Sequence, residues 1–206
     1  MSLEQLLARA QVWRAGSLPA AGGHPSGFTV LDAVLPGGGW PRSGLTEILS
    51  DVPGIGAVRL LLPALAALSR AGHWVVWIAP PYLPFAPALV AQGFELERLL
   101  VVELPPPSAP RQALWAFEQA LRFSACGAAL CWSQPLGERA LRRLQLAAES
   151  GATWGLVFRE HACAARPSPA PLRLLLEPVK GREAALQVTV HKARGGPAGR
   201  ACVLEL

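Results

Sequence analysis

The alternation of short apolar runs with amphipathic segments constrains the fold of this chain more than any other feature. Apolar runs of five or six residues occupy 45–49, 74–78, 99–104, 128–132 and 153–158. Between them, apolar residues recur at helical spacing in 58–71, 111–124 and 138–150, and a shorter helix is expected to end near Gly93. Because continuous apolar runs are typical of strands buried on both faces, the pattern predicts an α/β fold with a mostly parallel sheet and flanking helices.

The last part of the chain follows a different pattern. Residues 160–171 contain prolines at positions 167, 169 and 171 and are expected to form an exposed loop. Three further apolar runs follow at 172–176, 184–190 and 201–206, and turn-rich sequences at 180–182 and 195–197 separate them. Strands joined by such turns predict an antiparallel meander that extends the parallel sheet.

The N-terminal segment differs from the rest in composition. Apolar residues lie at helical spacing in 3–14, and a stretch rich in Gly and Pro follows at 16–25. We therefore expect an amphipathic helix and a linker over 1–25, and one core domain over 26–206. The helix could pack on its own domain or contact a neighbouring molecule. No basic region precedes an apolar core here, so no signal peptide is predicted.

Cysteine spacing, run length and charge limit the classes of partner. The cysteines at 126, 131, 163 and 202 form no Cys-x-x-Cys pair and no histidine stands at zinc-finger spacing, so no metal is predicted. Free thiols fit a reduced, cytoplasmic compartment. The apolar runs are far shorter than the ~20 residues that a membrane span needs, so no membrane contact is predicted. The formal charge of +5 favours anionic partners such as nucleic acid, although ordinary solvation of an arginine-rich surface also explains it.

A strand, a Gly-bearing turn and a helix after residue 45 raise the hypothesis of a phosphate-binding loop. In such a loop, backbone N–H groups surround the phosphate, a lysine neutralises it, and a Ser or Thr hydroxyl holds Mg²⁺. Gly54 and Gly56 are present, but Ala57 and Val58 stand where the Lys and the Ser or Thr are required. No lysine precedes position 180, and Arg59, the nearest cation, is more simply explained as a helix-surface residue. We therefore predict no bound nucleotide and no other cofactor.

The ends of two later strands also lack the acids that nucleotide hydrolysis requires. The run at 74–78 is followed by Ala79-Pro80-Pro81, without a carboxylate to activate water. The run at 128–132 ends in Trp132, where metal-bound nucleotide chemistry needs an acid. The four histidines have no Cys, Ser or acid at catalytic spacing. No catalytic residue is predicted, and the chain is not expected to be an enzyme.

Arginines around the fifth apolar run are candidates for nucleic-acid contact. Three belong to the segment 138–150 and three surround the loop that follows; in chain order they are Arg139, Arg142, Arg143, Arg159, Arg166 and Arg173. Several arginine–phosphate contacts would make affinity for single-stranded DNA fall steeply with salt. No aromatic residues suited to base stacking are interleaved in this stretch, and a solvated helix face is an equally open interpretation of Arg142 and Arg143.

Residues 26–48 resemble the sequence before the phosphate loop of RecA-type recombinases. They contain a Gly at 27, a Leu31-Asp32 pair, a Gly-Gly-x-Pro turn at 38–41 and a strand with Glu47-Ile48, in this order. The turn Pro-Gly-Ile-Gly at 53–56 and the sequence Trp-Val-Val-Trp-Ile-Ala-Pro-Pro at 74–81 are similar to the ImuA family of RecA-like proteins, which are encoded with mutagenic translesion polymerases in many bacteria. The resemblance extends over residues 26–206 and implies a RecA-like fold.

The same resemblance implies a function. An ImuA-like protein would be a non-catalytic accessory factor in SOS-induced, error-prone translesion DNA synthesis, and would act through protein contacts. The implied partners are ImuB, an error-prone C-family DNA polymerase and, as a further candidate, RecA, with single-stranded DNA as an open addition. The implied location is the bacterial cytoplasm, with or without association with the nucleoid.

A second resemblance gives the alternative function. Residues 60–159 are also similar to SulA, a bacterial division inhibitor that binds the tubulin-like protein FtsZ. SulA has no clear counterpart to residues 26–48 or to the last pair of strands, and this chain has both. The ImuA family is therefore the preferred interpretation, and a SulA-like inhibitor of cell division remains the alternative.

Overall fold

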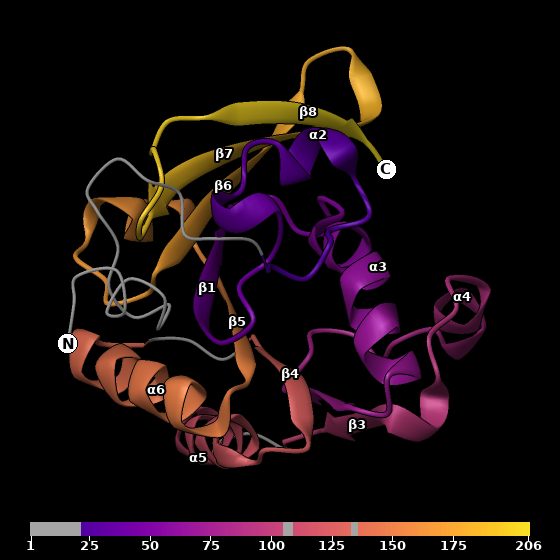
Figure 1. Ribbon diagram of the computed structural model, residues 1–206, viewed down its shortest axis with the longest axis vertical. Coiled ribbons are helices and arrows are strands. Elements are labelled where there is room, and N and C mark those ends of the chain that lie inside the picture. The colour runs from indigo at the N-terminus through magenta and orange to yellow at the C-terminus, as the bar shows by residue number, and fades with distance from the viewer. Residues whose placement is uncertain (1–21, 105–108, 133–135) are drawn as a thin grey trace, which may run out of the picture.

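An eight-stranded sheet forms the centre of the structure (Figure 1). The computed structural model describes residues 22–104, 109–132 and 136–206, so the helix expected at 3–14 lies outside the described residues. The strands are β1 (Gly44–Leu49), β2 (Trp74–Ile78), β3 (Leu99–Val102), β4 (Cys126–Cys131), β5 (Trp154–Arg159), β6 (Leu172–Val179), β7 (Arg182–Ala193) and β8 (Ala201–Glu205). Their order across the sheet is β3-β2-β4-β5-β1-β6-β7-β8.

The first six strands pair in parallel with one another, and the pairings of β7 with its two neighbours are antiparallel. β1 pairs in parallel with β5 on one side and with β6 on the other. β7 then pairs antiparallel with both β6 and β8. The predicted mostly parallel sheet with an antiparallel extension is therefore confirmed.

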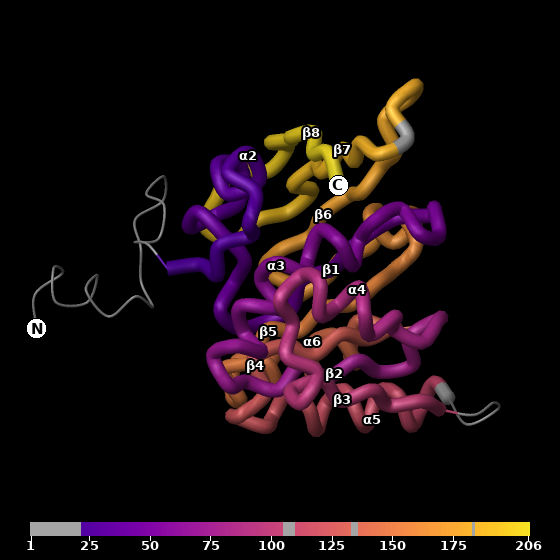
Figure 2. Tube along the Cα trace, turned by 90° about the vertical axis from the view of Figure 1, so that its right-hand side faces the viewer, coloured from indigo at the N-terminus to yellow at the C-terminus, as the bar shows by residue number. Residues whose placement is uncertain are grey.

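Helices cover both faces of the sheet, as predicted. They are α2 (Thr29–Asp32), α3 (Ala57–Arg70), α4 (Ala86–Ala91), α5 (Ala109–Arg122) and α6 (Glu138–Gly151), with short 3-10 turns at Pro36–Gly38, Leu96–Arg98 and His161–Ala165. α3 packs in the core on one face, and α5 and α6 pack in the core on the other. α2 lies with the antiparallel strands at one end of the molecule, and α5 lies at the opposite end (Figures 1 and 2).

The sheet has a hydrophobic core on each of its two faces, and this explains the continuous apolar runs in the sequence. Along β1, Leu45 packs under α5 and α6, whereas Ile48 packs under α3. Along β5, the neighbours Leu156 and Val157 divide between the two cores in the same way. Successive side chains of a strand point to opposite faces, and here both faces are covered, so most positions of both sets are apolar.

α5 and α6 approach each other closely. A Cβ atom on Gly151, the last residue of α6, would lie 2.0 Å from the carbonyl oxygen of Leu121 in α5. Only a glycine allows this contact between the helices. Within the described ranges, no helix is long and apolar enough to cross a membrane.

Candidate functional site: a cleft at the degenerate phosphate loop

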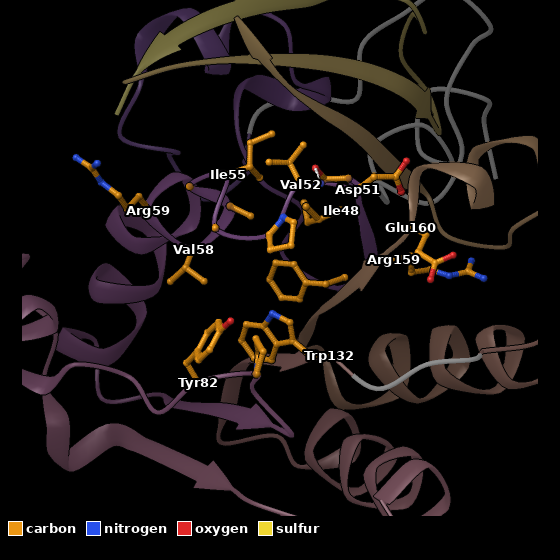
Figure 3. Close-up of a pocket in the computed structure, with 17 residues that line it drawn as sticks. Ile48, Asp51, Val52, Ile55, Val58, Arg59, Tyr82, Trp132, Arg159 and Glu160 are labelled. Atoms are coloured by element: carbon orange, nitrogen blue, oxygen red, sulfur yellow. Dashed lines mark hydrogen bonds between the residues drawn. The ribbon is translucent and has the colours of Figure 1, made fainter. Parts of the chain in front are cut away.

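A cleft with a volume of about 870 Å³ opens where β1, β2, β4 and β5 end (Figure 3). The loop 50–56 and the first turn of α3 form one wall. Residues 81–82, which follow β2, lie opposite, and Trp132 and residues 158–160 complete the lining. The carboxyl ends of parallel strands are where ligand-binding crevices of α/β folds lie, so we take this cleft as the candidate site.

The loop has the strand–turn–helix arrangement of a phosphate site but not its side chains. Gly54 and Gly56 have positive φ angles of 72° and 94°, and Gly56 immediately precedes α3. α3 then begins with Ala57 and Val58, so apolar side chains occupy the positions of the Lys and of the Ser or Thr. The N–H groups at the helix start remain, but no lysine accompanies them.

The two arginines that line the cleft direct their charges away from it. Arg59 is exposed and its guanidinium points outward (Figure 3). Arg159 is buried, and its Nη1 donates a hydrogen bond to Oε1 of Glu47 at 3.2 Å. Asp51 adds a negative charge beside the loop, where its Oδ1 accepts a hydrogen bond from the His161 N–H at 2.8 Å. This arrangement opposes the binding of a polyphosphate.

Aromatic side chains form the floor of the cleft. Trp132, at the end of β4, stacks on Phe158 with ring centroids 4.5 Å apart and an interplanar angle of 5°. The centroid of the Trp77 ring lies 5.5 Å from that of Trp132, and the two rings are tilted relative to each other. Ala79 turns the chain after β2 with a positive φ of 49°, and Tyr82 then faces the cleft (Figure 3). The cleft therefore offers an apolar, aromatic surface where hydrolysis would need a carboxylate.

Two of the six candidate DNA-binding arginines do not belong to an exposed surface, and this part of the prediction is wrong. Arg159 and Arg173 are only 6% and 3% exposed. Arg173 Nε donates to the second carboxylate oxygen of Glu47 at 2.8 Å, and its Nη2 donates to the carbonyl of Cys163 at 2.6 Å. The Ser168 hydroxyl donates to Glu47 as well. Because their charges are buried and paired, neither arginine can reach a phosphate.

The other four arginines are exposed, but they lie on two different parts of the structure. Arg139, Arg142 and Arg143 lie on the outer side of α6, and Arg166 lies in the loop after β5. Arg142 pairs with Glu138 at 3.1 Å, and Arg143 pairs with Glu118 of α5 at 2.8 Å. That these four contact DNA stays a prediction.

Sequence reasoning missed two features of these regions. Glu47 stands inside an apolar run predicted to be buried on both faces, and a buried carboxylate requires a cationic partner, so a signal was present. Trp115 was missed because it precedes the arginines of α6 by more than twenty positions. It is 65% exposed on α5 and lies one turn before Glu118, the residue that pairs with Arg143.

Metal and thiol chemistry find no support in the described residues. Nowhere in the described ranges do three or more His, Cys, Asp or Glu side chains gather as a metal site would require. The four cysteines are free thiols. Burial raises the pKa of the Cys126 thiol to about 12, so this thiol is protonated and unreactive at neutral pH.

The fold is that of a RecA-like α/β domain, and the loop between β1 and α3 carries no lysine. One solved structure, an ATPase domain, has the same fold: the two structures align with a TM-score of 0.66 over 100% of this chain and 95% of that one, at 14% sequence identity. So distant a likeness identifies the fold alone.

The sequence comparisons then identify the family. The family model described as cell division inhibitor SulA matches residues 45–155. SulA of Edwardsiella piscicida is 32% identical over 124 residues, which cover 58% of this chain and 70% of that protein. ImuA of Caulobacter vibrioides is 31% identical over 154 residues, which cover 72% of this chain but only 60% of that protein's length. The chain therefore belongs to the SulA family and is a homologue of ImuA, which confirms both resemblances.

Proposed function

We propose that this chain is a non-catalytic, RecA-like accessory protein of SOS-induced, error-prone translesion DNA synthesis. Its homology to ImuA supports the process, and the lining of the cleft supports the mechanism. One observation carries the proposal: Ala57 and Val58 replace the phosphate-binding side chains, and both arginines of the cleft direct their charges elsewhere. A fold that has lost its nucleotide chemistry can still present surfaces to other proteins.

The proposed partners are ImuB and an error-prone C-family DNA polymerase, with RecA as a further candidate. We propose that the chain holds this polymerase assembly together at damaged DNA in the bacterial cytoplasm, on or off the nucleoid. Residues 26–206 would form the core that makes these contacts. The segment 1–25 would act as a helix and a linker, and limited proteolysis that leaves 26–206 intact would test this division.

Two measurements on the purified chain test the proposal. Size-exclusion chromatography with ImuB, the C-family polymerase and RecA should show co-elution with at least one of them. Titration calorimetry with Mg²⁺–ATP should show no heat of binding, and phosphate release should equal the buffer blank. Failure to bind any of the three proteins, or Mg²⁺-dependent ATP binding, would refute the proposal.

A SulA-like division inhibitor is the second candidate, because the matching family model carries that description. It predicts that the purified chain binds FtsZ and lowers the amount of FtsZ polymer that sediments in the presence of GTP. It also predicts filamentous cells on overexpression. Normal cell length together with unchanged FtsZ sedimentation would exclude this candidate and leave the first one standing.

A further inference from the structure

We infer that the cleft at the degenerate phosphate loop is a docking site for a segment of another protein that carries an apolar anchor beside a basic residue. This inference deepens the proposed function and rests on it, because it assigns the surface through which an accessory protein would make its contact. It follows from the shape of the cleft, the apolar surface around it and the charges at its rim.

The cleft can accommodate an apolar side chain of any size. Its volume of about 870 Å³ lies within the range of about 300–1,000 Å³ that ligand sites occupy. Val52, Ile55 and Val58 contribute apolar side chains from the loop and the start of α3. Trp132 and Phe158 supply a flat aromatic floor. Aromatic and branched anchors that fill such pockets provide most of the binding energy in protein interfaces.

The apolar surface continues beyond the cleft, which favours a protein over a small molecule. Tyr82, Leu83 and Phe85 are 79%, 71% and 71% exposed, and Tyr82 itself lines the cleft. Single exposed apolar residues are ordinary on a soluble protein, but several together beside a pocket indicate an interaction surface. A ligand confined to the cleft would leave Leu83 and Phe85 in water, whereas a polypeptide segment lying across the rim would cover them.

The charges at the rim of the cleft indicate why the docked segment should carry a basic residue beside its apolar anchor. Asp51 and Glu160 lie on the same side of the cleft (Figure 3) and are exposed. Among the described residues, no ion pair involves either carboxylate, because the Arg159 guanidinium beside them is turned toward Glu47. Two exposed carboxylates at the rim repel phosphates and attract a Lys or Arg side chain.

Selection of peptides on the intact chain tests the inference without a known partner. The purified full chain is immobilised, a phage library of random twelve-residue peptides is selected on it, and enriched peptides are synthesised for fluorescence anisotropy. The expected peptides carry an aromatic or branched aliphatic residue beside Arg or Lys. Tyr82→Ala should weaken their binding by about tenfold, the loss typical of a truncated anchor contact. Glu160→Lys should weaken it as well, and rising salt should reduce that second effect.

Trp115→Ala provides the matched control. Trp115 is 65% exposed, like Tyr82, but lies on α5, which packs on the opposite face of the sheet from α3. Peptide binding should be unchanged in this variant. All three positions are exposed, so the variants are expected to fold, and circular dichroism spectra that match the wild type would verify it.

The inference is overturned if no peptide is enriched, if the enriched peptides are acidic, or if Tyr82→Ala and Trp115→Ala behave alike. It is also overturned if light scattering shows a dimer that Tyr82→Ala converts to a monomer, because the cleft would then bind a second copy. Co-elution with ImuB that Tyr82→Ala leaves intact would reject the docking site but keep the proposed function. Peptide binding without co-elution of any proposed partner would support the docking site but reject the proposed function.

Discussion

At Glu47, a single buried carboxylate joins three neighbouring strands. Its two oxygens accept hydrogen bonds from Arg159 of β5 and Arg173 of β6, and Glu47 itself is completely buried in β1. The second arginine also donates to backbone carbonyls of the segment that follows β5. The cluster therefore fixes the segment that follows Glu160, the last residue of the cleft lining along the chain.

Replacing this carboxylate should be strongly destabilising. Glu47→Gln is expected to lower the free energy of unfolding by about 3–5 kcal/mol, because two buried guanidinium groups lose their counter-charge. Urea denaturation followed by circular dichroism measures the change. Glu205→Gln is the matched control, since Glu205 pairs with Arg182 at the surface and its loss should cost less than about 1 kcal/mol. Equal effects of the two variants would contradict this account of the cluster.

His24 gives a second prediction at the scale of one residue. Burial lowers the pKa of His24 below its ordinary value of 6.5, and the charge of Arg42 and then His73 lower it further. The unfolded chain therefore binds the proton more readily than the folded chain, so this contribution to stability is present above about pH 6.5 and is lost as the pH falls.

Thermal unfolding between about pH 5 and pH 8 should show this loss as a falling Tm on acidification, and His24→Gln should show a smaller fall. The backbone bridge between His24 and Trp40 does not depend on the side chain, so the variant should remain folded. An unchanged dependence of Tm on pH in His24→Gln would assign the acid sensitivity to other groups.

Single residues also mark the limit of what the sequence could predict. The apolar character of Ala57, Val58 and Trp132 is explicit in the sequence, so the prediction that the chain binds no nucleotide could be made without coordinates. The burial of Arg159 and Arg173 could not be predicted, because the order of the strands decides whether an arginine side chain contacts a carboxylate or water. That order brings Glu47 directly opposite Arg173 in the register between β1 and β6.

At the scale of elements, the prediction was most accurate where the pattern was continuous. The expected run at 74–78 coincides with β2 (Trp74–Ile78), and the expected helix at 138–150 nearly coincides with α6 (Glu138–Gly151). The segment 160–171 was less well predicted. Its prolines suggested an exposed loop, but it contains a 3-10 turn, and Ala170 is completely buried. Its carbonyls bind the Arg173 guanidinium, a long-range contact that local sequence does not show.

The outer face of α5 and α6 is the remaining candidate for DNA contact. Arg139, Arg142 and Arg143 project from α6, and Trp115 of α5 is 65% exposed and available to stack on a base. Replacing the three arginines with alanine should weaken binding to single-stranded DNA. The slope of log K against log salt should become shallower by about 0.7 for each phosphate that an arginine no longer neutralises.

Fluorescence anisotropy of a labelled oligonucleotide over a range of salt concentrations measures both quantities. Arg182→Ala is the control, because Arg182 is an exposed arginine on β7 and its replacement removes the same kind of charge from a different element. If the triple variant and the control bind DNA equally, this face is a solvated helix surface.

At the scale of the whole molecule, the antiparallel strands complete the core that α3 begins. Leu204 of β8 is 3% exposed and belongs to the same core cluster as the buried residues of α3, and β8 also contacts α2. Removing residues 201–206 should therefore destabilise the protein by at least the roughly 2–5 kcal/mol that truncating a buried leucine costs.

The loss should appear as a lower Tm and as aggregation in size-exclusion chromatography, because the edge of β7 becomes exposed. Val203→Thr is a mild control, since Val203 is 43% exposed on the same strand and its substitution should have little effect. A truncated chain with the Tm of the wild type would show that the sheet is stable without its last strand.

The position of the cleft has a consequence for how such a protein can change its role. The cavity exists because β1, β2, β4 and β5 end at one edge of the sheet, and buried backbone and core residues fix that geometry. Among the side chains that face the cavity, Asp51, Val52 and Tyr82 are exposed and belong to neither core cluster. Substitutions at these exposed positions can therefore change the chemistry of the lining without disturbing the scaffold that forms the cavity.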